Sequence, residues 1–198
     1  MQKWLIGIDE AGRGPLAGPV AVGVACVPRN FDWGIIPGVG DSKTIAPKRR
    51  EALYRQAFSL RQSGVINWRV SMVSASVIDG KGISYAIRLG IRRGLLALNK
   101  NPKQCEVRLD GLLKAPAQYL LQEAIIKGDA SEPVIGLASI LAKVTRDRYM
   151  LRLGQREKFA PYNFAVHKGY GTKKHREIIA KIGLSAMHRR SFCTNLLV

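Results

Sequence analysis

The chain has 198 residues, 46% of them hydrophobic, which suffices for one compact domain with a substantial core. It carries 32 Lys and Arg against 14 Asp and Glu, a net charge of +18, so we expect a polyanionic partner, first nucleic acid and second an anionic membrane surface. The longest uncharged run, 14–27, is too short to span a membrane, and the residues before Asp9 are too few for a signal peptide. Three widely spaced cysteines indicate neither a disulfide framework nor a zinc cluster, which favours the cytoplasm.

Hydrophobic patterning predicts five strands and four long helices. The strands are expected at 4–8, 20–27, 65–73, 105–109 and 124–126, and the helices at 47–62, 83–98, 133–153 and 173–182. The first three strands are close enough in sequence to pair antiparallel, and later strands alternate with helices. This order predicts an α/β domain with a mixed sheet flanked by helices.

Acidic residues follow three of the predicted strands. Asp9 ends the first, Asp110 ends "CEVRLDG" and Asp129 follows "AIIKGD". Because ligand sites in open α/β sheets lie at the carboxyl ends of strands, we expect these three and the neighbouring Glu10 to come together. A single acid, such as Asp110 in its Asp-Gly pair, is more often a turn residue or an ion-pair partner. Four such acids in an acid-poor chain favour a site.

Glu10 directly follows Asp9, and adjacent residues of a regular strand face opposite sides. We therefore expect the strand to end between them, with Gly12 and Gly14 permitting a sharp turn. Neighbouring carboxylates raise each other's pKa unless cations neutralise them, and oxygen ligands favour Mg²⁺ or Mn²⁺. A basic chain with such a centre indicates phosphodiester chemistry, in which two ions activate water and stabilise the leaving oxygen.

Two short motifs offer groups that suit a polynucleotide. Gly12-Arg13-Gly14 indicates a backbone platform whose N–H groups a polymer can approach closely, although a tight turn between strands explains the glycines equally well. Tyr170 lies between two glycines in "HKGYGT" and can place its ring against a sugar or base, or simply pack.

Hydroxyl and ammonium groups are paired in two places. Ser139 and Lys143 are four residues apart and share one face of the predicted helix 133–153, a combination that suits phosphate. Ser42 and Lys43 offer the same groups from a loop. The alternative for Lys143 is a solvated ion pair with Asp147.

The C-terminal part of the chain is strongly basic, and we expect it to form the duplex-binding surface. Only three acids oppose its cations, and its histidines show no metal-ligand spacing, so we interpret them as structural or phosphate-proximal. The cations are Lys143, Arg146, Arg148, Arg152, Arg156, Lys158, Lys168, Lys173, Lys174, Arg176, Lys181, Arg189 and Arg190.

Seven sequence blocks resemble bacterial ribonuclease HII, in that family's order. They are "IDEAGRGPLAGPV" from residue 8, "DSK" at 41–43, "DG" at 110, "KGD" at 127–129, "ASILAKVTRDR" at 138–148, "HKGYGT" at 167–172 and "HRRSF" at 188–192. The resemblance implies an RNase H-like fold as one catalytic domain, 1–198, with a basic helical extension from about residue 150. Because the first block begins near the start, we expect no extra N-terminal substrate-binding domain of the kind in ribonuclease HIII.

The resemblance also implies an activity and a set of site residues. The enzyme is expected to cut RNA in RNA/DNA hybrids and to cut 5′ of ribonucleotides embedded in duplex DNA, leaving 3′-hydroxyl and 5′-phosphate ends, as a cytoplasmic monomer that binds no membrane. The metal-binding acids implied are Asp9, Glu10, Asp110 and Asp129. The substrate contacts implied are Gly12, Arg13, Gly14, Ser42, Lys43, Ser139, Lys143 and Tyr170, with the glycine loop at the ribose 2′-hydroxyl and Tyr170 beside the ribonucleotide.

The sequence departs from the family pattern beside Asp129, at "ASEP" and at residues 135–137. Two other functions compete with the nuclease reading. A non-catalytic nucleic-acid-binding protein explains the charge but has no need for acids at three strand ends. A metal-dependent nuclease for DNA junctions shares those acids but does not require the glycine and tyrosine motifs.

Overall fold

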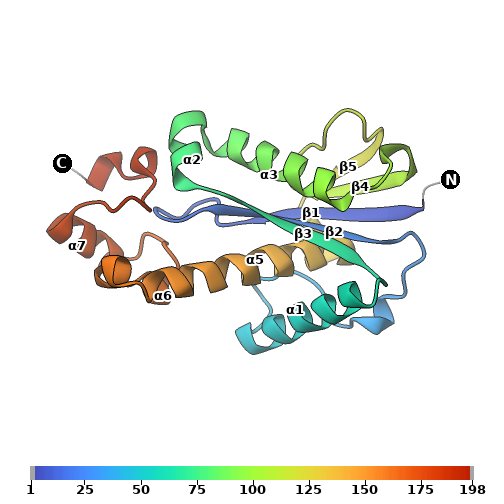
Figure 1. The fold of residues 1–198 in the computed structure, drawn as a ribbon, viewed down its shortest axis with the longest axis horizontal. Coiled ribbons are helices and arrows are strands. Elements are labelled where there is room, and N and C mark those ends of the chain that lie inside the picture. Colours follow the sequence, from blue (N-terminus) through green and yellow to red (C-terminus); the bar gives the residue numbers. More distant parts are fainter. Residues whose placement is uncertain (1–2, 197–198) are drawn as a thin grey trace.

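A computed structural model describes residues 3 to 196. A five-stranded mixed sheet forms its centre, in the spatial order β3-β2-β1-β4-β5 (Figure 1). The antiparallel strands are β1 (Trp4–Ala11), β2 (Val20–Pro28) and β3 (Asn67–Val73), and β4 (Cys105–Asp110) and β5 (Leu121–Ile125) extend the sheet parallel to β1. The predicted mixed α/β sheet is confirmed.

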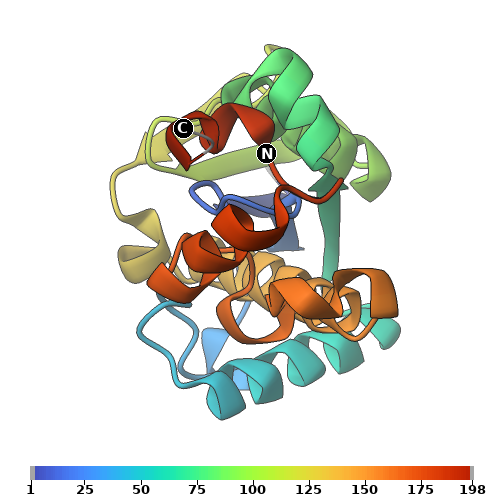
Figure 2. The same ribbon diagram turned by 90° about the vertical axis from the view of Figure 1, so that its left-hand side faces the viewer.

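Helices cover both faces of the sheet. One face carries α2 (Ala75–Lys81) and α3 (Ile83–Leu98), and the other carries α5 (Pro133–Gly154) with α1 (Pro47–Gln62) outside it (Figures 1 and 2). The short α4 (Gly128–Ser131) and α6 (Phe164–His167) flank α5, and α7 (Lys173–Ile182) follows. In residues 3–196 no helix combines the length and apolar character needed to cross a membrane.

Glycines allow α5 to pack directly against the sheet. A Cβ atom at Gly7 would lie 2.1 Å from the carbonyl oxygen of Val134, and one at Gly23 would lie 2.2 Å from that of Ala138. Any side chain at either position would therefore push the helix away. This close packing sets Ser139 beside the carboxyl end of β1.

The C-terminal segments lie across the end of the sheet at which β1 finishes (Figures 1 and 2). Met150 and Leu153 of α5 pack there against Phe159, Tyr162 and Phe164 in a small apolar cluster. The predicted extension from about residue 150 is thus helical and anchored on α5. Its last two residues lie outside the described part of the chain.

The structure differs from the predicted elements at two edges. Strand β3 begins at Asn67 instead of 65, because a turn at Gly64 with positive φ ends α1 and leaves Val65 exposed. Strand β5 spans Leu121–Ile125 instead of 124–126. Its residues are mostly exposed, so alternation of buried and exposed positions gave no signal there.

Candidate active site

The carboxyl ends of two adjacent parallel strands bring Asp9 and Asp110 together. Strand β1 pairs with β4 in a register that sets Ile8 opposite Leu109, so the next residue on each strand is an aspartate. One oxygen of Asp110 accepts a hydrogen bond of 2.9 Å from the N–H of Gly128. The sheet topology thus produces the pair expected from the strand ends.

The expectation that β1 ends between Asp9 and Glu10 is wrong. The strand continues to Ala11, and Glu10 lies opposite Val22 of β2. Asp9 lies on the α5 face, where it lines the cleft together with Ser139, while Glu10 lies on the α3 face. The two carboxylates still repel each other although they lie on opposite faces, because both are close to the end of β1.

Asp129 does not follow a strand end directly, which corrects a second expectation. It lies in the short helix α4 and is buried, with one oxygen 3.8 Å from Nζ of Lys43. Asp41 is a fifth acid near this group, which the sequence reasoning did not single out. One Asp41 oxygen accepts a hydrogen bond of 2.8 Å from the N–H of Lys43, and Asp41 also interacts with Asp129.

The acids strongly influence one another. Burial, with repulsion from Glu10 and Asp110, raises the pKa of Asp9 to about 7. Burial also raises the pKa of Glu10 and, with repulsion from Asp110 and Asp41, that of Asp129. Burial opposes the charge of Lys43, but the surrounding carboxylates outweigh it and raise the pKa of that lysine. The group therefore favours added positive charge.

As arranged, the side chains of residues 3–196 include no set of three His, Cys, Asp or Glu that could hold a metal ion. Hydrogen-bond donors of the protein and Lys43 occupy the carboxylates instead: Gly128 holds Asp110, and the N–H of Glu10 donates to Asp9 at 2.7 Å. The carboxylates nevertheless fit a hard divalent cation, because they offer only oxygen ligands and a cation would relieve the repulsion between their negative charges.

A cleft of ≈ 530 Å³ collects the predicted site residues. All of them line it except Asp129, which adjoins it through Lys43. The lining residues are Asp9, Glu10, Ala11, Gly12, Arg13, Gly14, Ser42, Lys43, Arg50, Asp110, Ser139, Lys143 and Tyr170. Arg50, which the sequence reasoning did not select, donates to the carbonyl oxygen of Ser42 and so ties α1 to this loop.

The paired hydroxyl and ammonium groups meet in this cleft. The Ser139 hydroxyl donates to that of Ser42 at 2.7 Å, and both side chains are buried. Lys143 lies 2.9 Å from Asp147, the alternative raised from the sequence, yet its ammonium also lies 5.8 Å from the ring centroid of Tyr170. The Tyr170 side chain is 42% exposed, so its ring faces the cleft and does not pack in the core.

Two buried arginines hold the loop that joins β1 to β2. Arg189 donates to the carbonyl oxygens of Gly12, Arg13 and Gly18 at 2.7, 2.8 and 2.9 Å. Arg146 donates to the carbonyl oxygens of Ala17, Pro19 and Lys168 at 3.1, 2.9 and 3.0 Å. These hydrogen bonds fix the direction of the loop backbone.

This arrangement turns two amide donors of the loop away from Arg189. In a trans peptide the C=O and N–H groups point in opposite directions. Because Arg189 binds the carbonyls of Gly12 and Arg13, the N–H groups of Arg13 and Gly14 point away from Arg189, in a loop that lines the cleft. The loop therefore connects two strands and lines the cleft, and its use as a backbone platform stays a prediction.

The same finding corrects the predicted basic surface. Arg146 and Arg189 are fully buried and bind carbonyl oxygens, so neither is free to contact a duplex. Arg148 lies over the ring of Tyr54 and pairs with Glu51. Exposed cations of the extension remain, at Arg152, Arg156, Lys158, Lys173, Lys174, Arg176, Lys181 and Arg190.

Three buried histidines support Tyr170, in agreement with the structural role expected for them. His188 accepts a hydrogen bond at Nδ1 from the N–H of Ser185, so its Nε2–H is left to donate to Nε2 of His175 at 3.0 Å. His175 in turn uses Nδ1–H for the carbonyl oxygen of Tyr170 at 2.8 Å. His167 stacks on His175. Burial lowers the pKa of both His175 and His188 to about 4, which keeps this chain of bonds neutral.

Comparison with known proteins agrees with these features. The family model described as Ribonuclease HII matches residues 6–195. The chain belongs to the ribonuclease HII family. A ribonuclease HII from Caldicellulosiruptor bescii is 43% identical over 195 residues, which cover 98% of this chain and 89% of the relative. One from Geobacillus kaustophilus is 40% identical over 188 residues, covering 95% and 67%.

Solved structures of the family share the fold. The ribonuclease HII of Archaeoglobus fulgidus, in a complex with PCNA, superposes with a TM-score of 0.76 at 26% identity, covering 98% of this chain and 97% of that one. The ribonuclease H2 of Pyrococcus horikoshii gives 0.68 at 25% identity, covering 98% and 96%. Membership confirms the RNase H-like fold and the predicted enzyme class, a ribonuclease H, which is a divalent-metal-dependent hydrolase.

Proposed function

We propose that this protein is an endonuclease that cleaves the RNA strand of RNA/DNA hybrids and cuts on the 5′ side of ribonucleotides embedded in duplex DNA. The products carry 3′-hydroxyl and 5′-phosphate ends. One observation carries the proposal: a backbone platform at Gly12 to Gly14 and the exposed ring of Tyr170 line the same cleft as three carboxylates. When a phosphate of the substrate lies at the carboxylates, the sugar attached to that phosphate lies next to the Gly12 to Gly14 loop.

Asp9, Glu10, Asp110 and Asp129 are the residues we assign to the metal, Mg²⁺ or Mn²⁺. Two such ions would supply activation of the attacking water and stabilisation of the leaving oxygen. Their positive charge would also keep Asp9 ionised at neutral pH, which its burial otherwise opposes. Bst-RNase HIII, which is 20% identical, has been solved in complex with Mn²⁺.

The remaining residues position the polynucleotide. The outward N–H groups of Arg13 and Gly14 bind the ribose 2′-hydroxyl, the group that distinguishes RNA from DNA. Ser42, Lys43, Ser139 and Lys143 donate to phosphate oxygens next to the reacting one. The ring of Tyr170 packs against the sugar. The ammonium group of Lys143 lies near this ring and is held in place by its ion pair with Asp147.

In the cell this activity removes ribonucleotides during DNA replication and repair. We further propose that residues 1–198 form one catalytic domain that acts as a cytoplasmic monomer. The exposed cations of the extension bind the phosphates of the duplex on either side of the cut.

The decisive experiment compares four substrates in Mg²⁺: an RNA/DNA hybrid, a DNA duplex with one ribonucleotide, the same duplex in all-DNA form and a DNA four-way junction. We expect cleavage of the first two alone, 5′ of the ribonucleotide in the second. Binding without cleavage of any would support a non-catalytic nucleic-acid-binding protein, and cleavage of DNA four-way junctions instead would support a junction nuclease.

Asp9→Asn provides the matched control. This substitution keeps the size of the side chain and removes its charge, so cleavage should be lost while duplex affinity stays within a few fold. Equal loss of binding and cleavage would contradict the assignment of Asp9 to the metal.

A further inference from the structure

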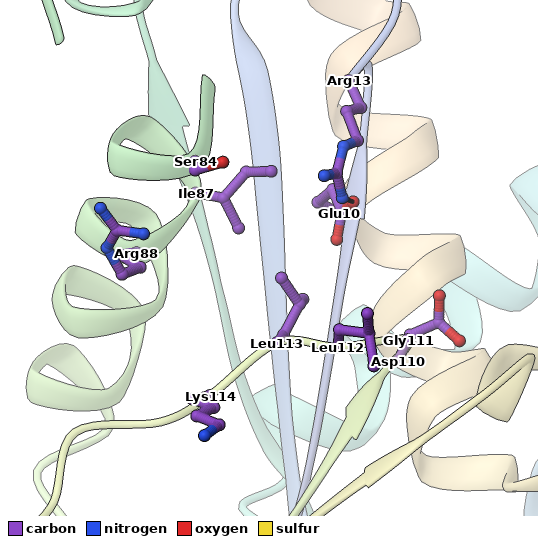
Figure 3. A pocket seen from close by; sticks show the side chains of 10 residues that line it. All are labelled: Glu10, Arg13, Ser84, Ile87, Arg88, Asp110, Gly111, Leu112, Leu113 and Lys114. Carbon is purple, nitrogen blue, oxygen red and sulfur yellow. Dashed lines mark hydrogen bonds and ion pairs between the residues drawn. The ribbon is translucent and has the colours of Figure 1, made fainter. Parts of the chain in front are cut away.

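A second hollow, of ≈ 280 Å³, adjoins the acidic residues on the α3 face of the sheet (Figure 3). It shares Glu10, Arg13 and Asp110 with the cleft described above. Its other walls come from α3 and from the segment that follows β4. The family assignment and the residues predicted from sequence leave this hollow without a role.

The walls of this hollow combine apolar and cationic groups. Leu112, which is 87% exposed, and Leu113 form apolar walls, and Ser84, Arg88 and Lys114 line it as well (Figure 3). Within residues 3–196, neither Arg88 nor Lys114 has an ion-pair partner. Apolar walls beside free cations suit a sugar or base that is attached to phosphate.

The topology of β1 links the two hollows. Asp9 faces α5 and the cleft with Ser139, Lys143 and Tyr170, whereas Glu10 faces α3 and the second hollow. A polynucleotide is continuous on both sides of the phosphate that reacts. If the reacting phosphate of a nucleic-acid strand lies at the end of β1 and the nucleotide on one side of it lies at Tyr170, the nucleotide on the other side lies across Glu10, towards α3.

We propose that the second hollow binds a nucleotide of the cleaved strand on the side of the reacting phosphate remote from Tyr170. Its sugar or base packs on Leu112 and Leu113, and its phosphate lies between Arg88 and Lys114. Arg13, whose guanidinium is 3.4 Å from Glu10, offsets the negative charge that Glu10 presents to this nucleotide. The inference rests on the proposed function, because it concerns the same strand.

The test uses DNA duplexes with one ribonucleotide, in which the cleaved strand is lengthened one nucleotide at a time on its 5′ side or its 3′ side. The complementary strand stays constant. The enzyme is compared with the double variant Arg88→Ala/Lys114→Ala, whose replaced side chains are both exposed, so the core is unaffected. Arg93→Ala is the matched control, since this exposed arginine lies on α3 but outside the hollow.

We expect the double variant to raise KM about tenfold for strands that are long on one side, with kcat within about twofold. The difference should vanish when the strand is truncated on that side only. The slope of log KM against log salt should fall by about 1.8, or about 0.9 for each phosphate contact. Arg93→Ala should keep the wild-type dependence on strand length, so its KM relative to wild type should be the same for every strand.

Two results would overturn the proposal. One is a double variant that behaves like Arg93→Ala, or that loses affinity equally for extensions on both sides. The other is inhibition by a free deoxynucleoside monophosphate that depends on Arg88 and Lys114 without any effect of strand length, which would make the hollow a site for free nucleotide. Failure of the proposed function is distinct, because the unchanged enzyme would then cleave none of these duplexes.

Discussion

Replacing Arg189 by lysine tests whether the loop at Gly12 to Gly14 depends on a buried guanidinium. Arg189 is fully buried and donates to three carbonyl oxygens, two of them in this loop. Lysine keeps the positive charge and most of the stem. Its single ammonium cannot reproduce the planar fork that reaches three acceptors in different directions.

The size of the effect follows from the lost hydrogen bonds. If lysine retains one of the three, two charge-assisted bonds are lost at about 1.5 kcal/mol each, so the free energy of unfolding falls by about 3 kcal/mol. For a chain of this length, that corresponds to a decrease in Tm of about 6 to 12 °C. The freed loop amides are no longer oriented, so kcat/KM for a lone ribonucleotide should fall at least about tenfold, equivalent to about 1.4 kcal/mol.

The measurements are thermal unfolding by circular dichroism and single-turnover cleavage, the latter well below the Tm of the variant. Arg190→Lys is the control, because this neighbouring arginine is exposed and makes no hydrogen bond to the loop through its side chain. If Arg189→Lys unfolds and cleaves like Arg190→Lys, the guanidinium does not hold the loop. A loss of stability with unchanged kcat/KM would show that the loop orientation does not contribute to catalysis.

Three further predictions concern the same end of the molecule. Gly12→Ala should reduce stability by more than about 1 kcal/mol in denaturant unfolding and impair cleavage, since Gly12 has φ +87° and a Cβ there would lie 2.0 Å from Nε of Arg146; wild-type values would contradict the packing. Tyr170→Ala should slow cleavage at a lone ribonucleotide more than cleavage of a continuous hybrid, and equal slowing would remove its role at the junction. Burial lowers the pKa of His175 and His188 from 6.5 to about 4, so on acidification these histidines are protonated first in the unfolded chain. The free energy of unfolding should therefore fall as the pH drops from about 6.5 to about 4, by up to about 3 kcal/mol for His175. His175→Gln should flatten this pH dependence.

The main elements of the fold could be predicted because their signals are local. Four of the five strands and the four long helices each show a run of apolar residues or a regular periodicity, and α5 appears within one residue of its predicted end. Strand β5 was misplaced because it is short and mostly exposed at the edge of the sheet. The short helices α2 and α4 lack the two or three turns that a periodic pattern requires.

The acids at the site could be predicted in identity but not in arrangement. Strand ends located Asp9 and Asp110, because parallel neighbours finish at the same edge of a sheet. That Asp9 and Glu10 lie on opposite faces yet still interact depends on how far the sheet extends beyond them, which strand periodicity does not reveal. Asp41 joins the group through a loop contact that spans almost ninety residues to Asp129, and such contacts leave no local pattern.

The buried arginines show why composition alone misled. In a chain with 32 basic residues, an arginine is expected on the surface. Arg146 nevertheless lies in line with Ala142 and Met150, which are four residues away on either side and buried, so helix periodicity offered a signal. Arg189 lies in an irregular segment, where no periodicity exists to reveal burial.

These contacts make the C-terminal extension a structural support of the candidate active site. Arg189 binds the loop that we propose to face the ribose, and His175 binds the backbone of Tyr170, so both proposed recognition elements depend on residues beyond 150. Asp79 of α2 secures this segment in turn, by accepting from the N–H groups of Arg190 and Ser191 and from the Ser191 hydroxyl at 2.6 Å. If the extension only bound duplex phosphates, its removal would weaken affinity and leave the chemistry intact. Because it also holds the groups that recognise the ribonucleotide, its removal should abolish selectivity for that ribonucleotide even at saturating substrate.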